Sequence, residues 1–206
     1  MKYGREMVLV GVMMVAATTV ATRIVDVDGK TMSLAGETHT VEANDLGGFP
    51  DIDKNKYESL TEADGHITAD ILSKPARTDF YFKWSSGVSL PSASYRYGEI
   101  HYQVNPTSAG GFVGDSESNR LRLQTTNDAE AWDDFSNPET IPGSVGPHSF
   151  IIDLHANRTY TGHWNALRWD FFNDVRNAGK SITIEKIVFA REITPISDTA
   201  VGLILW

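Results

Sequence analysis

The sequence predicts an all-β protein, an antiparallel jelly-roll β-sandwich with an N-terminal β arm or hairpin. From residue 65 onward, short segments alternate between apolar and polar residues with a period of two, which is typical of strands with one buried face. Turn residues separate these segments at regular intervals, as in sandwiches and barrels. With 206 residues, of which 41% are hydrophobic, the chain is long enough to bury a core between two sheets.

Residues 1–36 are expected to form an arm and a β-hairpin. The apolar run from Met7 to Val15 is rich in Val, which favours a strand. Within residues 23–34, two β-prone runs flank Asp28-Gly29, a dipeptide that a type I′ hairpin turn favours. The alternative is a secretory signal peptide over residues 1–21, because a short charged leader precedes the apolar run and small residues follow it. The run is too short for a membrane helix, which needs roughly 20 apolar residues.

Residues 37–64 are rich in Gly, Asp, Asn and Glu, and they are expected to be connecting loops. The sandwich itself is expected over residues 65–206. Its strands are marked by the segments HITADI, DFYFKW, EIHYQV, RLRLQ and SFIIDL, in each of which every second residue is apolar. The side chains expected to be buried between the sheets are Phe80, Phe82, Trp84, Ile100, Tyr102, Leu121, Leu123, Phe150, Leu154, Leu167, Trp169, Phe171, Ile184, Ile187 and Phe189.

The stretch over residues 167–190 combines aromatic and charged residues, so it is either a binding face or the last strands of the core. Leu167, Trp169 and Phe171 share one face of a strand, and large alternating aromatics are typical of a packed core. We therefore expect a strand, a turn and a second strand. The apolar phase of the second strand slips by one residue at Glu185-Lys186, which predicts a β-bulge there.

Several segments taken together resemble a known fold family. The segments LRWDFFND and GKSITIEKIVFA follow DGHIT, YRYGEIHYQVN, NRLRLQTT and GPHSFIIDL. This succession, over about residues 64–191, resembles the galactose-binding-like, carbohydrate-binding-module type of jelly roll. It departs from the family pattern at Phe171, where Pro is usual. The resemblance implies a five-over-four β-sandwich that is often non-catalytic and often holds a structural Ca²⁺.

The segment DIDKNKYESLTE spaces its oxygen donors as an EF-hand calcium loop does. Asp51, Asp53 and Asn55 occupy loop positions 1, 3 and 5, and Glu62 occupies position 12. Against this, Lys56 stands where the sharp turn of an EF-hand needs Gly. Three interpretations stay open: an EF-hand, another type of Ca²⁺ loop, and a solvated acidic turn.

Composition excludes some classes of site and disfavours others. The absence of Cys excludes disulfides and Cys-ligated zinc. A net charge of −9 disfavours nucleic acid as a partner, because phosphate binding relies on clustered Lys and Arg. The sequence contains no nucleophile elbow, no H-E-x-x-H motif and no Gly-rich phosphate loop. We therefore expect a protein that is not an enzyme and whose acidic charge suits Ca²⁺ and neutral glycans.

Aromatic and polar residues at outward strand positions or in loops are candidates for glycan binding. An aromatic ring offers a flat apolar face to sugar C–H groups, while Arg and carboxylates bond the hydroxyls. Trp132 is the strongest candidate, because it lies among carboxylates in an expected loop; the alternative is that it anchors this loop to the sandwich edge. The candidates are Tyr81, Tyr97, His101, Arg122, Trp132 and Trp164.

Two functions are expected from these features. In the first, the chain is a structural or adhesive protein of an oligomeric extracellular assembly, such as a virion decoration or fibre protein, and residues 7–22 dock onto other subunits by strand addition. In the second, it is a secreted glycan-binding protein of the carbohydrate-binding-module type, and residues 1–21 are removed. Both place the protein outside the cell or on a virion surface. We prefer the first, because an uncleaved Val-rich strand needs a partner that covers its edge.

Overall fold

Antiparallel strands account for nearly all of the regular structure, and they form two sheets, which confirms the predicted all-β sandwich. Within the described part of the chain, the helical structure is a single 3₁₀ turn over Val175–Asn177. The computed structural model describes residues 32–42, 57–71, 79–83, 90–113, 120–127, 133–135, 141–155, 159–170 and 175–196.

The first sheet has six strands in the order β2-β3-β11-β6-β9, with β1 also paired to β11. Its centre is β11, which is 15 residues long. One edge of β11 pairs with β6, and the other edge pairs first with β3 and then with β1. The strands are β1 (Met32–Glu42), β2 (Tyr57–Ala63), β3 (His66–Ile71), β6 (Tyr97–Asn105), β9 (Gly146–Asp153) and β11 (Ser181–Pro195).

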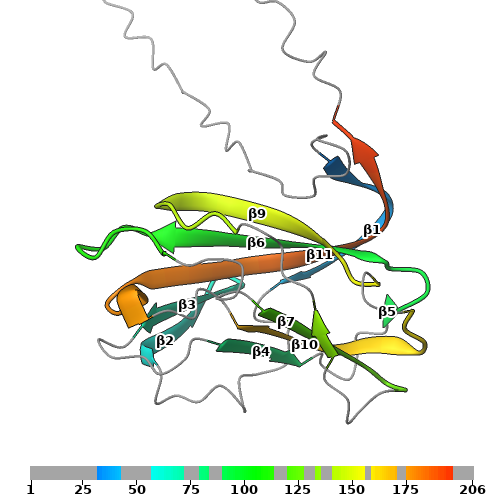
Figure 1. Ribbon diagram of the computed structural model, residues 1–206, viewed down its shortest axis with the longest axis horizontal. Helices are drawn as coiled ribbons and strands as arrows, with labels where there is room; N and C mark the ends of the chain where they lie inside the picture. The colour runs from blue at the N-terminus through cyan, green and yellow to red at the C-terminus, as the bar shows by residue number, and fades with distance from the viewer. Residues whose placement is uncertain are drawn as a thin grey trace, which may run out of the picture.

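The second sheet has five strands in the order β4-β10-β7-β8, with β5 paired to the start of β10. Figure 1 shows β4, β7 and β10 in one layer and β6, β9 and β11 in the other. Within the described residues, the two sheets therefore have more strands than the five-over-four arrangement that the resemblance implies. The strands are β4 (Asp79–Lys83), β5 (Leu90–Pro91), β7 (Arg120–Thr125), β8 (Asp133–Phe135) and β10 (His163–Asp170).

Two strands, β1 and β2, include residues for which the sequence predicts loops, and they contribute to the larger number of strands. The prediction of connecting loops over residues 37–64 is wrong for residues 37–42 and for Tyr57–Ala63. Residues 36–40 of β1 are exposed, as are the four residues of β2 whose side chains are described. These segments therefore lack the apolar alternation that reveals a half-buried strand.

A two-residue turn joins β2 to β3. Asp64 and Gly65 have φ values of 53° and 83°, and a type I′ turn requires positive φ at both of its central residues. The sequence points to a similar Asp-Gly turn at residues 28–29, which lie outside the described residues. The second strand of that expected hairpin is partly described: Met32–Leu34 pairs with the end of β11.

An aromatic cluster joins the two sheets at the centre of the core. Tyr102 of β6, Phe150 of β9 and Trp169 of β10 are fully buried. The ring centroid of Trp169 lies 5.4 Å from that of Tyr102 and 5.3 Å from that of Phe150. Burial confirms the predicted core at Ile100, Tyr102, Phe150, Leu154, Trp169, Ile184, Ile187 and Phe189. The remaining predicted core side chains lie outside the described ones: Phe80, Phe82, Trp84, Leu121, Leu123, Leu167 and Phe171.

The β-bulge predicted near Glu185-Lys186 is confirmed. The register between β6 and β11 shifts between Ile184 and Lys186, so that Glu185 is passed over. One extra residue in a strand reverses the alternation of its side chains. Ile184 and Ile187 are therefore both fully buried, although they are an odd number of positions apart.

Candidate functional site

Four strands of the five-stranded sheet bring polar residues into one row. Arg168 of β10 is paired in register with Tyr81 of β4 on one side and with Arg122 of β7 on the other. Arg122 is in turn paired with Asp134 of β8. We call these four residues the arginine row. Because neighbouring strands lie about 4.8 Å apart, the three steps from β4 to β8 span about 14 Å.

Trp169 shows which face of the sheet the arginine row belongs to. It follows Arg168 directly in β10, and it is fully buried between the two sheets. Successive residues of a strand alternate between the two faces of a sheet. The arginine row therefore lies on the outer face of the five-stranded sheet.

Two further rows lie on the same outer face, one on each side of the arginine row. They are two positions away along each strand, and residues with this spacing share a face. Five of their six members are charged residues or Gln. The residues are Asp79, Asp170 and Arg120 in one row, and Lys83, Ala166 and Gln124 in the other.

Sequence reasoning selected half of the arginine row. Tyr81 and Arg122 were candidates for glycan binding, whereas Arg168 and Asp134 were missed. Arg168 could have been identified from the sequence, because it directly precedes Trp169, a predicted core residue, and so occupies an outward position of the same strand. No comparable signal exists for Asp134, because β8 has only three residues and its partner strand cannot be read from the sequence.

Tyr97 and His101 lie on the outer face of the other sheet, and both are half-buried. The guanidinium carbon of Arg96 lies 5.3 Å from the ring centroid of Tyr97, a cation–π distance. His101 Nε2 lies 3.6 Å from a carboxylate oxygen of buried Glu99. The same oxygen accepts a hydrogen bond of 2.7 Å from Ser149 Oγ. Tyr97 and His101 belong to the six-stranded sheet, whereas Tyr81 and Arg122 belong to the five-stranded sheet.

The selection of Trp164 as a glycan-binding residue is wrong, because only 1% of this residue is exposed. Its ring packs against those of His155 and Tyr160, at centroid distances of 5.6 and 5.0 Å. The physical reason is a register shift between β10 and β7 at Trp164/Ala166. This irregularity reverses the alternation along β10, so Trp164 is buried as Trp169 is.

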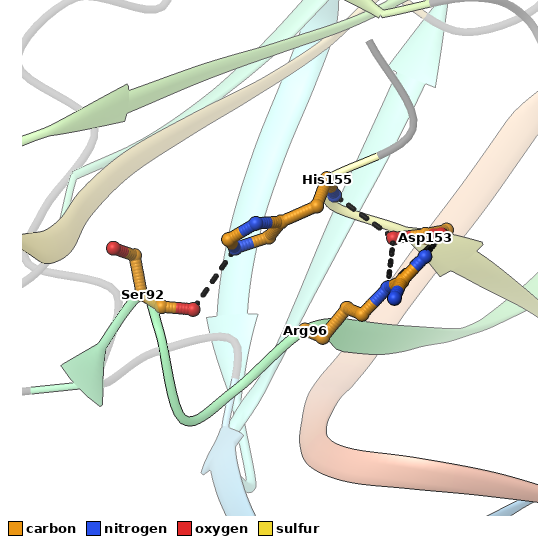
Figure 2. A network of polar contacts seen from close by, with 4 residues as sticks. All are labelled: Ser92, Arg96, Asp153 and His155. Atoms are coloured by element: carbon orange, nitrogen blue, oxygen red, sulfur yellow. Dashed lines mark hydrogen bonds and ion pairs between the residues drawn. The ribbon is translucent and has the colours of Figure 1, made fainter. Parts of the chain in front are cut away.

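A polar network next to Trp164 holds the ends of three strands together (Figure 2). Arg96 Nη2 donates a hydrogen bond of 2.6 Å to Asp153 Oδ2, and this hydrogen bond and the charge of Asp153 raise the pKa of Arg96. Asp153 Oδ1 accepts a bond of 2.9 Å from the backbone N–H of His155. His155 Nε2 lies 2.9 Å from the carbonyl oxygen of Ser92, which can only accept, so Nε2 donates. These mutual bonds give the network a structural role.

The predicted calcium loop does not fit an EF-hand. Its second half belongs to β2, where Glu62 is an exposed strand residue. An extended strand cannot curl its oxygens around a single cation, as the twelve-residue loop of an EF-hand does. Within the described ranges, no three His, Asp or Glu residues form a group that could hold a metal. Asp51, Asp53 and Asn55 lie outside these ranges, as does Trp132, so another type of Ca²⁺ loop there stays a prediction.

No protein-family model matches the sequence, and no curated protein matches it either. Among solved structures, a low-affinity xylan-binding module, CBM86, from the xylanolytic gut symbiont Roseburia intestinalis is similar, with a TM-score of 0.46 and 12% sequence identity. The similarity covers 77% of this chain and 97% of that module. A likeness of this size assigns neither a family nor a ligand to the chain. Over the part of the chain that the structure describes, no helix is long and apolar enough to cross a membrane.

Proposed function

We propose that the protein is a non-catalytic carbohydrate-binding β-sandwich and that the outer face of its five-stranded sheet holds the sugar. The arginine row carries this proposal, because it places an aromatic residue, two arginines and a carboxylate side by side on four strands. Sugar recognition uses this combination of residues. An aromatic ring packs against sugar C–H groups, while charged donors and acceptors bond the hydroxyls.

The position of the row on a sheet favours a polymer over a small ligand. A row of about 14 Å is longer than one sugar ring, and its four positions lie on paired strands of one sheet. The flanking rows add further polar groups on both sides of the arginine row. We place the protein outside the cell, where polysaccharides are accessible to it.

Tyr81→Ala tests this function, and Tyr97→Ala is its matched control. Both variants remove one tyrosine from a strand, but Tyr97 lies on the outer face of the other sheet. Calorimetric titration of the full chain with a panel of soluble plant and microbial polysaccharides measures the affinity. We expect Tyr81→Ala to weaken binding at least about tenfold, which is about 1.4 kcal/mol, and Tyr97→Ala to leave it unchanged. Loss of binding in Tyr97→Ala alone would move the site to the other face.

A second function, docking in an assembly, is favoured by one feature of β1 and β11. β11 pairs with β6 as far as Ala190 and then continues to Pro195, where β1 is its partner within the described residues. Figure 1 shows these two strand ends curving away from the two layers. Among the described residues, no strand pairs with the other edge of β11 beyond Ala190, and another chain can add a strand at such an edge. In this proposal, residues 7–22 of a neighbouring subunit of a virion or another extracellular assembly supply that strand.

A further inference from the structure

β1 contains a β-bulge in its pairing with β11. The register between the two strands shifts between Ala35 and Thr38, so that Gly36 and Glu37 together lie opposite Arg191. Gly36 has a φ of 71°, which glycine adopts without the steric cost that a Cβ atom imposes. A bulge whose first residue is a glycine of this kind is a G1 bulge, and it bends the strand that contains it.

Beyond the bulge, the two strands form a ribbon that leaves the sandwich. β6 pairs with β11 as far as Ala190. Residues 192–195 of β11 then pair, within the described residues, with residues 32–35 of β1. We call these two segments the terminal ribbon, and Figure 1 shows it curving away from both layers. The bulge therefore lies at the junction between the terminal ribbon and the sandwich.

The carboxylate of Glu37 connects the bulge to the body of the sandwich. Tyr95 Oη donates a hydrogen bond of 3.2 Å to Glu37 Oε1, and Arg191 Nη2 lies 2.7 Å from Glu37 Oε2. Tyr95 is buried in the turn after β5. Its N–H donates to Pro91 O, and its carbonyl oxygen accepts a bond from Trp164 Nε1. One oxygen of Glu37 is therefore bonded to a firmly held turn, and the other to the strand opposite the bulge.

This connection is exposed and easily broken. Within the described residues, the bond to Tyr95 is the one side-chain hydrogen bond between β1 and any element other than β11. The side chains of Glu37 and Arg191 are 56% and 50% exposed. Ion pairs this exposed contribute little to stability, and salt screens them. The connection can therefore open while the sandwich stays folded.

We infer that the bulge at Gly36 and Glu37 is the hinge of the terminal ribbon, and that Glu37 is the latch that holds the ribbon in its present direction. Loss of the bond to Tyr95 frees the bulge to change its bend, because glycine has a wide choice of backbone angles. The ribbon then changes direction relative to the two sheets while its own strands stay paired. This device depends on neither proposed function. In the docking proposal, it sets the direction in which the edge of β11 faces a neighbouring subunit.

The distance between two spin labels measures the direction of the terminal ribbon. The chain has no Cys, so Thr194→Cys in the ribbon and Thr61→Cys in β2 place labels at these two positions alone in the full chain. Both threonines are exposed. Dilution with unlabelled chain removes distances between copies. At low salt we expect one narrow distance distribution. Glu37→Ala or Tyr95→Phe should widen it and displace its mean, because each removes the bond between the bulge and the turn.

Further variants assign the effect to Glu37. Glu192→Ala is the matched control, because it removes an exposed carboxylate from the terminal ribbon itself and should leave the distribution narrow. Glu37→Gln keeps an acceptor for Tyr95 but loses the charge that pairs with Arg191, so we expect an intermediate width. Added salt should widen the distribution of the labelled chain without further substitution, because it screens the exposed pair. Melting curves confirm that each variant is folded.

Gly36→Ala tests the hinge. The added methyl group has room, since the nearest heavy atom would lie 3.8 Å away, but a φ of 71° is unfavourable for Ala. We therefore expect a displaced mean distance, and an unchanged mean would overturn the hinge. A distribution as narrow in folded Glu37→Ala as in the unsubstituted chain would overturn the latch. Equal widening in Glu192→Ala and Glu37→Ala would overturn it too, because any loss of charge would then have the same effect.

Discussion

The indole Nε1 of Trp164 donates a hydrogen bond of 2.9 Å to the main-chain oxygen of Tyr95. This bond connects the start of β10 to the turn after β5, in which the backbone N–H groups of Ser94 and Tyr95 both donate to Pro91 O. β5 also pairs directly with β10. Trp164 therefore links the start of β10 to the turn after β5, and its role is to stabilise the fold.

Substitutions of Trp164 test this structural role. Trp164→Phe keeps an aromatic ring but leaves Tyr95 O without the indole donor, so we expect a loss of about 1–3 kcal/mol in the free energy of unfolding. Trp164→Ala also opens a cavity and should cost about 3–5 kcal/mol. Urea denaturation measures both values. Folded Trp164→Phe should bind polysaccharide as the wild type does, and a selective loss of binding would return Trp164 to the candidate site.

Trp169 should be equally sensitive, because its ring packs against those of Tyr102 and Phe150 in the core. We expect Trp169→Ala to lower the free energy of unfolding by about 3–5 kcal/mol. Arg191→Ala is the surface control. It removes an ion pair whose partners are 50% and 56% exposed, and such pairs contribute about 0–1 kcal/mol. An unchanged melting temperature for Trp169→Ala would contradict the core assignment.

Period-two alternation predicted the buried strands well, because burial of one face imposes it directly on the sequence. It identified Ile184 and Ile187 on either side of a bulge, since both stay apolar while the phase slips. Alternation failed at Trp164, where the register shift in β10 depends on pairing with β7. It also failed for β2, an edge strand whose described side chains are exposed and carry no apolar pattern.

The arginine row was less predictable than the core. Tyr81 and Arg122 are outward positions that alternation reveals, but their strands are far apart in sequence. They form one row only because β10 pairs between β4 and β7. This strand order results from long-range packing, which a local pattern does not encode. Arg168 can therefore be recognised as a candidate binding residue only once its register partners are known.

Because of Tyr102, we expect the free energy of unfolding to fall at alkaline pH. Burial raises the pKa of its hydroxyl well above the usual value, and the hydroxyl donates a bond of 2.6 Å to Pro142 O. Above pH about 10, the unfolded chain loses this proton while the folded chain keeps it. The stabilisation is thus complete below that pH, and it falls by about 1.4 kcal/mol per pH unit above it. Urea titrations from neutral to alkaline pH measure the slope.

Tyr102→Phe is the control for this pH dependence. It lacks the titrating hydroxyl, so its stability should fall less steeply with rising pH, although it starts from a lower value at neutral pH because the bond to Pro142 is lost. Equal alkaline slopes for the variant and the wild type would show that Tyr102 does not titrate in the unfolding equilibrium.

Deletion of residues 1–22 tests the docking function. In the docking proposal, the Val-rich run from Met7 to Val15 adds as a strand to the edge of β11 beyond Ala190, where β1 is the partner within the described residues. We expect the full chain to form oligomers in sedimentation experiments and the deletion variant to be a monomer with an unchanged melting temperature.

A full chain that stays monomeric at high concentration would contradict self-assembly, and a lower melting temperature in the variant would make the segment part of the sandwich. A mature N-terminus near Thr22 in protein from the natural source would identify the segment as a signal peptide, which supports the secreted carbohydrate-binding function.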